Sequence, residues 1–332
     1  MLNIDKALLK TIRDQIESGA DRELLVILSE MHAADLAEVL DHLKREEAHY
    51  VFRLVPKELK SDVLIELEED VRLELLASMT SAEIAGDVLE GLDSDDAADV
   101  MADLPDAKVE EVIELLEDDE QASDIRDLLS YPEGTAGALM AKELVQVQST
   151  WTVARAIREI RRQADELEHV YTIYVTDGEN HLTGRLSLKH LLLSAATTRT
   201  LVSELQQDKE LISIGANEPA ERVTKLMERY DLVALPVLDE EGRLVGRITI
   251  DDAVDVIIED AERDYQLASG ISEDVESRDD VWTLTRARLP WLLIGLAGGI
   301  GGAYVIGAFE IEKNPGMALF IPLIAAMGGN VG

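Results

Sequence analysis

The chain has 332 residues and a formal net charge of −37, from 68 acidic and 31 basic residues. This length suits two or three domains. The charge excludes nucleic-acid binding as the main function, because phosphate contacts need clustered lysine and arginine. It favours cations, since a divalent ion relieves repulsion among carboxylates. The absence of cysteine excludes disulfides, thiol catalysis and Cys-ligated zinc.

Residues 1–130 are expected to form short helices throughout, beginning with an amphipathic helix rather than a signal peptide. A similar phrase recurs as ADLAEVLDHL from Ala34, AEIAGDVLEGL from Ala82 and DDAADVMADL from Asp95. Short helices that cannot each bury a face favour a stacked, all-α superhelix. This segment holds 36 acidic and 12 basic residues. A surface selected for solubility, or a salt-adapted one, would show the same excess.

Residues 131–250 are expected to form two copies of one α+β module in the order β-α-β-β-α. Strand-like runs at 171–175 and 233–238 follow helical patterns at 152–163 and 219–230. The run YTIYVTDGENHLTGRLSLKHLL aligns with VALPVLDEEGRLVGRITIDDAV and places Gly184 on Gly246, 62 residues later. We expect modules at 131–198 and 199–250, related by a pseudo-twofold axis.

Residues 251–288 are predicted to form an acidic connecting helix, interrupted near Gly270. The next 21 residues, 289–309, carry no charge and are long enough to span ~30 Å of hydrocarbon. Arg286 and Arg288 precede this run and favour a cytoplasmic location for that end. A second apolar segment begins at residue 316, and the chain stops within it. We therefore expect a truncated transmembrane domain, with a first span at 289–311 and the start of a second at 316–332.

This order of parts resembles the MgtE-type magnesium channels, in which a helical superhelix precedes a CBS-domain pair, a connecting ("plug") helix and a glycine-rich span. The resemblance covers the whole chain but only the first one and a half of the family's five membrane helices. The motifs that carry it are YPEGTAGALM from Tyr131, IDDAVD from Ile250, RLPWLL from Arg288, Phe309-Glu310, and FIPLIAAMGGNVG from Phe320.

The resemblance implies magnesium transport by a homodimer in the lipid bilayer of the plasma (inner) membrane. It places the N-terminal domains in the cytoplasm, where they bind several Mg²⁺ ions and close the pore when occupied. The implied ligands are carboxylates three to five residues apart on helical faces, each of which could instead be a solvated helix face. They are Asp95, Asp99, Glu221, Asp231, Asp252, Asp255, Asp260 and Asp264.

Two positions depart from the family pattern. Pro219 and Arg263 stand where the family often has an acidic residue, and either change can remove or weaken one ion site. Glu310 and Asn330 are the candidate pore residues, the second through its carbonyl. The family's key pore acid lies in a later helix.

A second hypothesis is an adenine-nucleotide sensor, with ATP as a regulator. CBS pairs often bind adenosine nucleotides through a Ser or Thr and an Asp three residues on. Thr249 and Asp252 fit this pattern, whereas Ser187 fits but is followed by His190 in place of the Asp. No Gly-rich phosphate loop occurs, which argues against ATP as fuel.

Two further classes are disfavoured. An enzyme is not expected, because the six histidines are scattered and neither an HExxH pair nor a nucleophile elbow occurs. A CBS-regulated efflux protein of another family would usually place its membrane domain before the CBS pair.

Overall fold

The computed structural model describes residues 6–164, 167, 170–193, 199–207, 211–268 and 281–308. They belong to two compact units, Met1–Ile258 and Glu259–Gly332. The predicted interruption at Gly270, the pore candidates Glu310 and Asn330, and the second apolar segment all lie outside the described residues.

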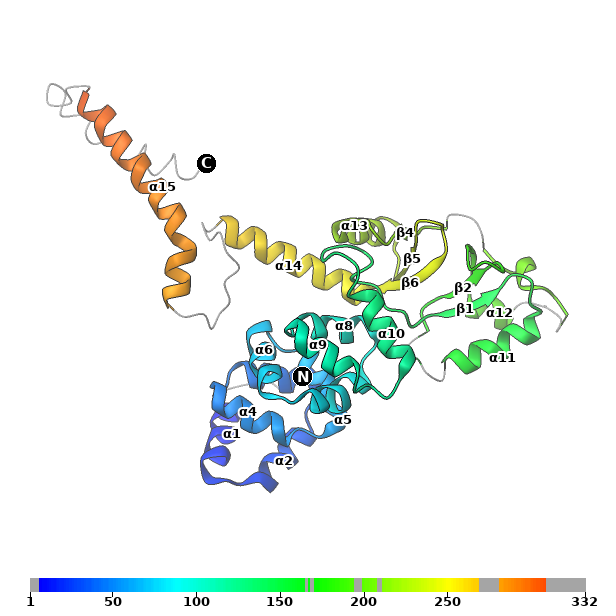
Figure 1. The fold of residues 1–332 in the computed structure, drawn as a ribbon, viewed down its shortest axis with the longest axis horizontal. Coiled ribbons are helices and arrows are strands. Elements are labelled where there is room, and N and C mark those ends of the chain that lie inside the picture. Colours follow the sequence, from blue (N-terminus) through cyan, green and yellow to red (C-terminus); the bar gives the residue numbers. More distant parts are fainter. Residues whose placement is uncertain are drawn as a thin grey trace. The chain divides into compact units, whose positions relative to one another are not determined.

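Residues 6–130 form an all-helical domain, as predicted for this part of the chain (Figure 1). Apolar residues at helical spacing build its core, for example Ala33, Leu36, Ala37 and Leu40 on one helix. The helices are α1 (Lys6–Ser18), α2 (Asp21–Ser29), α3 (Ala33–Asp41), α4 (Arg45–Leu54), α5 (Lys57–Ile65), α6 (Glu69–Ser78), α7 (Ser81–Glu83), the π-helical turn η1 (Ile84–Val88), the 3-10 turn η2 (Leu89–Gly91), α8 (Ser94–Ala102), α9 (Asp106–Ile113) and α10 (Asp119–Leu128).

Two α+β modules follow, in the predicted β-α-β-β-α order. The first contains β1 (Val145–Gln148), α11 (Val153–Ala164), β2 (Ile173–Thr176), β3 (Leu182–Leu186) and α12 (Leu188–Leu193). After the 3-10 turn η3 (Val202–Glu204), the second contains β4 (Ile214–Gly215), α13 (Ala220–Tyr230), β5 (Ala234–Leu238), β6 (Leu244–Thr249) and α14 (Ile250–Ala268).

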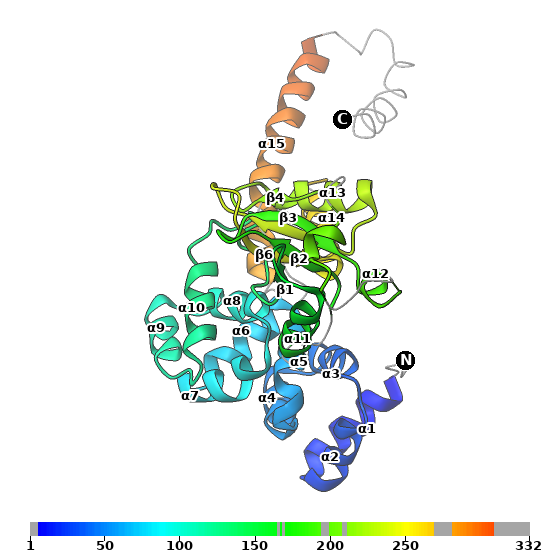
Figure 2. The same ribbon diagram turned by 90° about the vertical axis from the view of Figure 1, so that its right-hand side faces the viewer.

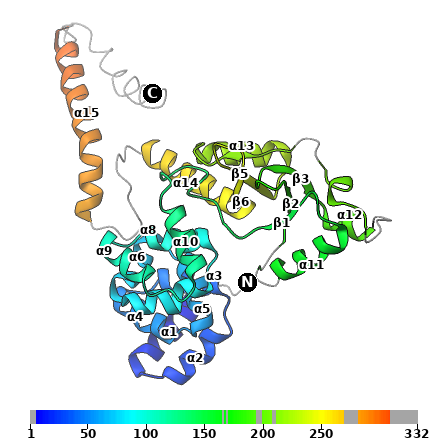
Figure 3. The same cartoon turned by 45° about the vertical axis from the view of Figure 1, so that its right-hand side comes forward.

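The two modules repeat each other in strand pairing. In each sheet the first two strands are parallel and the last two antiparallel. Val175 pairs with Gly184 in the first sheet, and Val237 pairs with Gly246 in the second, which is the predicted offset of 62 residues. In Figure 3, α11 lies along the sheet of the first module and α13 along that of the second.

The modules are interlocked by the segments that lead into them. Ala141, which precedes β1, pairs with Arg247 of β6, with N–O distances of 2.8 and 2.9 Å. Gln207, which precedes β4, pairs in the same way with Arg185 of β3. Figure 1 shows the two sheets next to each other, and in the view of Figure 2 they overlap. A Cβ on Gly246 would lie 2.8 Å from the Ala141 carbonyl oxygen, so glycine permits this close approach.

An apolar cluster joins the helical domain to the second module. Ala98 of α8 and Leu128 of α10 are buried in one cluster with Met140, Ile248 and Ala253. Because Ala253 lies in the first turn of α14, this packing brings the beginning of α14 close to α8.

The C-terminal part contains the rest of α14 and α15 (Val281–Ala308). Among the described helices, none combines the length and the apolar character that a bilayer crossing requires. The predicted span at 289–311 is therefore not confirmed.

Candidate metal site

The candidate site begins at the N-terminus of α8. This N-terminus is capped by Glu143, which belongs to the lead-in segment, residues 129–144 between α10 and β1. Ser94 is fully buried, and its backbone N–H and hydroxyl donate to the two carboxylate oxygens of Glu143, at 3.1 and 2.8 Å. The partial positive charge of the helix N-terminus favours this carboxylate. The capping draws Glu143 towards Asp93 and Asp95, and one oxygen of each of the three carboxylates lies within 4.8 Å of the others.

A second helix N-terminus adds carboxylates from the other side. Asp252, in the first turn of α14, accepts hydrogen bonds from the Thr249 backbone N–H at 2.7 Å and from its hydroxyl at 2.8 Å. The charge of Asp252 acts on both Asp95 and Asp96 of α8. The site therefore combines the beginnings of two helices from two domains with the segment that connects those domains.

Burial and mutual repulsion disfavour the ionised forms of Asp95, Asp96 and Asp252. Burial, followed by the charges of Asp252 and Asp96, holds the pKa of Asp95 well above its ordinary value. Burial, followed by the charges of Asp99 and Asp252, raises the pKa of Asp96 to about 7. Burial also raises the pKa of Asp252, against the hydrogen bonds from Thr249. Without a bound cation, this cluster holds its negative charge at an energetic cost.

The chemistry of the donors fits a divalent cation. Mg²⁺ prefers oxygen ligands, usually keeps several of its waters and is held by one or two carboxylates. Asp93, Asp95 and Glu143 offer three carboxylates at close range, and Asp252 adds negative charge beside them. A bound ion would neutralise negative charge that burial disfavours at this site.

The structure brings together some of the predicted ligands. The charge of Asp252 acts on Asp95, and Asp255 lies about one turn further along α14, where burial and then Asp252 raise its pKa. Asp99 is exposed on α8, but its charge reaches Asp96.

The other predicted ligands lie elsewhere. Glu221 and Asp231 stand at opposite ends of α13, both exposed, and neither belongs to the three-carboxylate group. Asp260 and Asp264 lie on α14 within the second compact unit.

The sequence analysis did not predict three acids at this site, namely Asp93, Asp96 and Glu143. Asp93 and Asp96 lie within two residues of the predicted Asp95 in the run DSDDAAD. Their closeness in the sequence could have identified them as further candidates. Glu143 gave no local signal, because it is 48 residues from Asp95 and reaches the site only through the packing of the lead-in segment.

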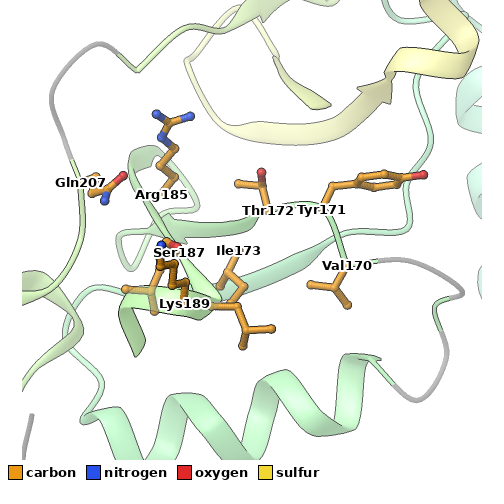
Figure 4. A pocket seen from close by; sticks show the side chains of 10 residues that line it. Val170, Tyr171, Thr172, Ile173, Arg185, Ser187, Lys189 and Gln207 are labelled. Carbon is orange, nitrogen blue, oxygen red and sulfur yellow. The ribbon is translucent and has the colours of Figure 1, made fainter. Parts of the chain in front are cut away.

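A pocket of about 400 Å³ lies on the first module (Figure 4). It contains the Ser187 of the imperfect nucleotide pattern, whereas in the second module the Thr249 hydroxyl is buried and bonded to Asp252. The pocket is lined by Val170, Tyr171, Thr172, Ile173, Arg185, Leu186, Ser187, Leu188, Lys189 and Gln207.

The fold and the site define a CBS-pair protein with a candidate cation site where the pair meets a helical domain. Residues 31–134 match the MgtE intracellular N domain, and residues 136–196 and 202–259 match the CBS domain. The magnesium transporter MgtE of Thermus thermophilus is 32% identical over 344 residues, which cover 99% of this chain and 74% of that protein. The chain belongs to the MgtE family of magnesium transporters, which confirms the predicted resemblance.

Other relatives agree with this assignment. The magnesium transporter MgtE of Enterococcus faecalis is 35% identical over 215 residues, 64% of this chain and 47% of that protein. The crystal structure of the cytosolic domain of the Mg²⁺ channel MgtE in complex with ATP matches with a TM-score of 0.67 and 35% identity, covering 75% of this chain and 99% of that one.

Proposed function

We propose that this chain is the magnesium-sensing part of a Mg²⁺ channel and closes the pore when intracellular Mg²⁺ is high. The observation that carries the proposal is the carboxylate cluster of Asp93, Asp95, Glu143 and Asp252, which joins the helical domain to the beginning of α14. The names of the relatives, magnesium transporter and Mg²⁺ channel, support the choice of cation.

The proposed mechanism uses the repulsion within the cluster. Without Mg²⁺, the desolvated carboxylates of α8 and α14 repel each other and favour separation of the helical domain from the second CBS module. A bound ion reverses this preference, because it interacts only with the closed arrangement. Since α14 continues towards the C-terminus, its position would report ion occupancy to the pore.

The remaining predicted features belong to the same proposal. The full-length protein would be a homodimer in the plasma membrane with these domains in the cytoplasm, and residues 289–332 would begin its membrane domain. Glu221, Asp231, Asp260 and Asp264 would hold further ions at surfaces that are completed by the second copy.

Mg²⁺ should protect the connecting segment 251–288 from proteolysis. We expect slower cleavage in millimolar Mg²⁺ than in its absence, because ion binding fixes the beginning of α14 against α8. The double variant Asp252→Ala/Asp255→Ala should lose most of this protection. Limited proteolysis followed by mass spectrometry of the cut sites measures the effect.

The matched control is Glu240→Ala/Glu241→Ala, which removes two exposed acids from the β5–β6 turn, outside the carboxylate cluster. It should keep the protection seen in the unmodified chain. Equal cleavage rates between zero and about 20 mM Mg²⁺, a range chosen to exceed weak-site affinities, would refute the sensing proposal.

A second proposed function is regulation by an adenine nucleotide at the first module. The pocket beside Ser187 carries an aromatic ring from Tyr171 and cationic groups from Arg185 and Lys189, which suit a base and phosphates respectively. The ATP complex of the related cytosolic domain supports this reading.

ATP should bind this pocket, with Tyr171→Ala and Lys189→Ala each weakening it about tenfold or more, because one removes stacking area and the other a phosphate partner. Isothermal titration calorimetry in the presence and absence of Mg²⁺ measures the affinity. An unaffected Thr249→Ala variant would place the site in the first module. Absence of binding heat under both conditions would exclude this nucleotide function.

A further inference from the structure

Arg247 is a buried guanidinium at the point where three parts of the chain meet. It belongs to β6 of the second CBS module and is 7% exposed. A buried cation requires partners, because the loss of its hydration is costly. The backbone of Arg247 pairs with Ala141. The partners of its side chain are separate from this pairing.

Each partner of the Arg247 side chain lies in a different part of the protein. The Nε group donates to the backbone carbonyl of Glu143 in the lead-in segment. An Nη atom lies 3.6 Å from a carboxylate oxygen of Asp93 in the helical domain. The guanidinium carbon lies 5.4 Å from the ring centre of Tyr171 in the first module. Arg247 therefore lies at the edge of the carboxylate cluster and contacts two residues that belong to it.

The contact with Asp93 differs in kind from the contact with Glu143. Asp93 occupies the N-cap position of α8, but its side chain makes no capping hydrogen bond, because Glu143 provides the cap. A nitrogen–oxygen distance of 3.6 Å is an ion-pair contact rather than a close hydrogen bond. The Asp93 carboxylate is also 46% exposed, so it can turn towards an ion without being drawn out of a packed core.

The charge of Arg247 also acts on the α14 side of the site. It attracts the carboxylate of Asp252 in the first turn of α14. The same guanidinium thus attracts carboxylates on both sides of the junction. This is the electrostatic role that a bound divalent cation would fill.

We propose that Arg247 is a tethered counter-cation of the metal site, which pairs with Asp93 when no ion is bound and weakens the affinity of the site by repelling the ion. The inference rests on the proposed function, since it concerns the same site. In the ion-free protein, Arg247 partly neutralises the cluster and links Asp93 to the second module. When Mg²⁺ binds, Asp93 exchanges its contact with Arg247 for the ion. The residue thereby raises the Mg²⁺ concentration at which the site fills.

The test compares Mg²⁺ affinities of charge-removing and charge-conserving variants by isothermal titration calorimetry. Arg247→Met removes the charge and keeps the length of the side chain. Because it removes repulsion of a divalent ion a few ångströms away, we expect the dissociation constant to fall about tenfold or more. Arg247→Lys keeps the charge and should stay within about threefold of the unmodified chain. Arg243→Met, which removes an exposed charge four residues earlier, should have no effect.

A purely structural role predicts the opposite result. If Arg247 only holds the junction together, Arg247→Met will bind Mg²⁺ with unchanged or lower affinity, and either outcome overturns the proposal. Circular dichroism melting checks the fold of each variant. Should Arg247→Met not fold, Arg247→Gln, which retains a donor for the Glu143 carbonyl, must show the same tightening.

The proposed function and this inference fail in different ways. If the unmodified chain binds no Mg²⁺, the sensing proposal fails and the role of Arg247 fails with it. If the unmodified chain binds Mg²⁺ and Arg247→Met does not bind it more tightly, only the role of Arg247 fails.

Discussion

Asp95→Asn should abolish the stabilisation that Mg²⁺ produces by binding at the α8 site, while leaving the ion-free protein at least as stable as the unmodified chain. Asp95 is half-buried, and the charges of Asp252 and Asp96 act on it. Its own charge therefore destabilises the ion-free fold and is favourable only when an ion is bound. Asparagine keeps the shape and can still accept the hydrogen bond that the Asp96 N–H donates at 3.0 Å. Such a gain of stability on loss of a functional group is common at binding sites.

The expected size follows from mass action. At a Mg²⁺ concentration of 100 times the dissociation constant, the unmodified chain gains about 2.7 kcal/mol. For a domain of this size that gain corresponds to a rise in Tm of roughly 5–10 °C. The variant should show almost none of this rise in thermal unfolding followed by circular dichroism.

Glu117→Gln provides the control, because it also removes one negative charge but from an exposed position between α9 and α10. It should retain the full Mg²⁺-dependent rise. If Asp95→Asn also retained the full rise, Asp95 would not be an ion ligand and the cluster on α8 would lose its proposed function.

The predictable parts of this protein are those with local or repeated signals. The alternation and turn residues around Gly184 recur 62 residues later around Gly246, and both copies have the expected pairing. The duplicated order of strands and helices follows from these patterns because hydrophobic periodicity reports local structure. The short helices of residues 6–130 follow from the same periodicity.

The metal site was only half predictable, because it depends on contacts between distant segments. Asp95 and Asp252 stood out because each lies in an acidic helical motif. Glu143 and Arg247 did not stand out in the sequence. Their positions result from the crossing of the lead-in segment to the second module, where Ala141 pairs with Arg247. Side-chain spacing along the sequence contains no record of such a crossing.

The same cluster predicts that the ion-free protein becomes less stable as the pH rises from about 5.5 to 8. The pKa of Asp96 in the folded state, about 7, lies above the ordinary value of 3.8 that applies to the unfolded chain. Between these two values the folded state binds the proton more tightly. The contribution of Asp96 to stability is therefore fully present below pH 3.8 and is lost as the pH rises through 7.

The loss attributable to Asp96 is roughly 2 kcal/mol between pH 5.5 and 8, from the linkage between proton binding and folding. Asp95 and Asp252, whose pKa values are also raised, act in the same direction. Carboxyl groups with lowered pKa values, such as Asp177 and Asp239, lose their stabilising effect only in more acidic solution. They therefore do not offset the trend in this window.

Mg²⁺ should oppose this loss, because the ion binds the deprotonated carboxylates that are unfavourable without it. Thermal unfolding at pH 5.5, 6.5, 7.5 and 8, with EDTA and with saturating Mg²⁺, measures both effects. We expect the Tm with EDTA to fall towards pH 8 and the increase produced by Mg²⁺ to be largest there. Asp96→Asn should flatten the fall with EDTA, since asparagine does not titrate. A Tm with EDTA that rises from pH 5.5 to 8 would mean that the cluster is hydrated and fully ionised in the ion-free protein, and repulsion within it could not drive the proposed opening.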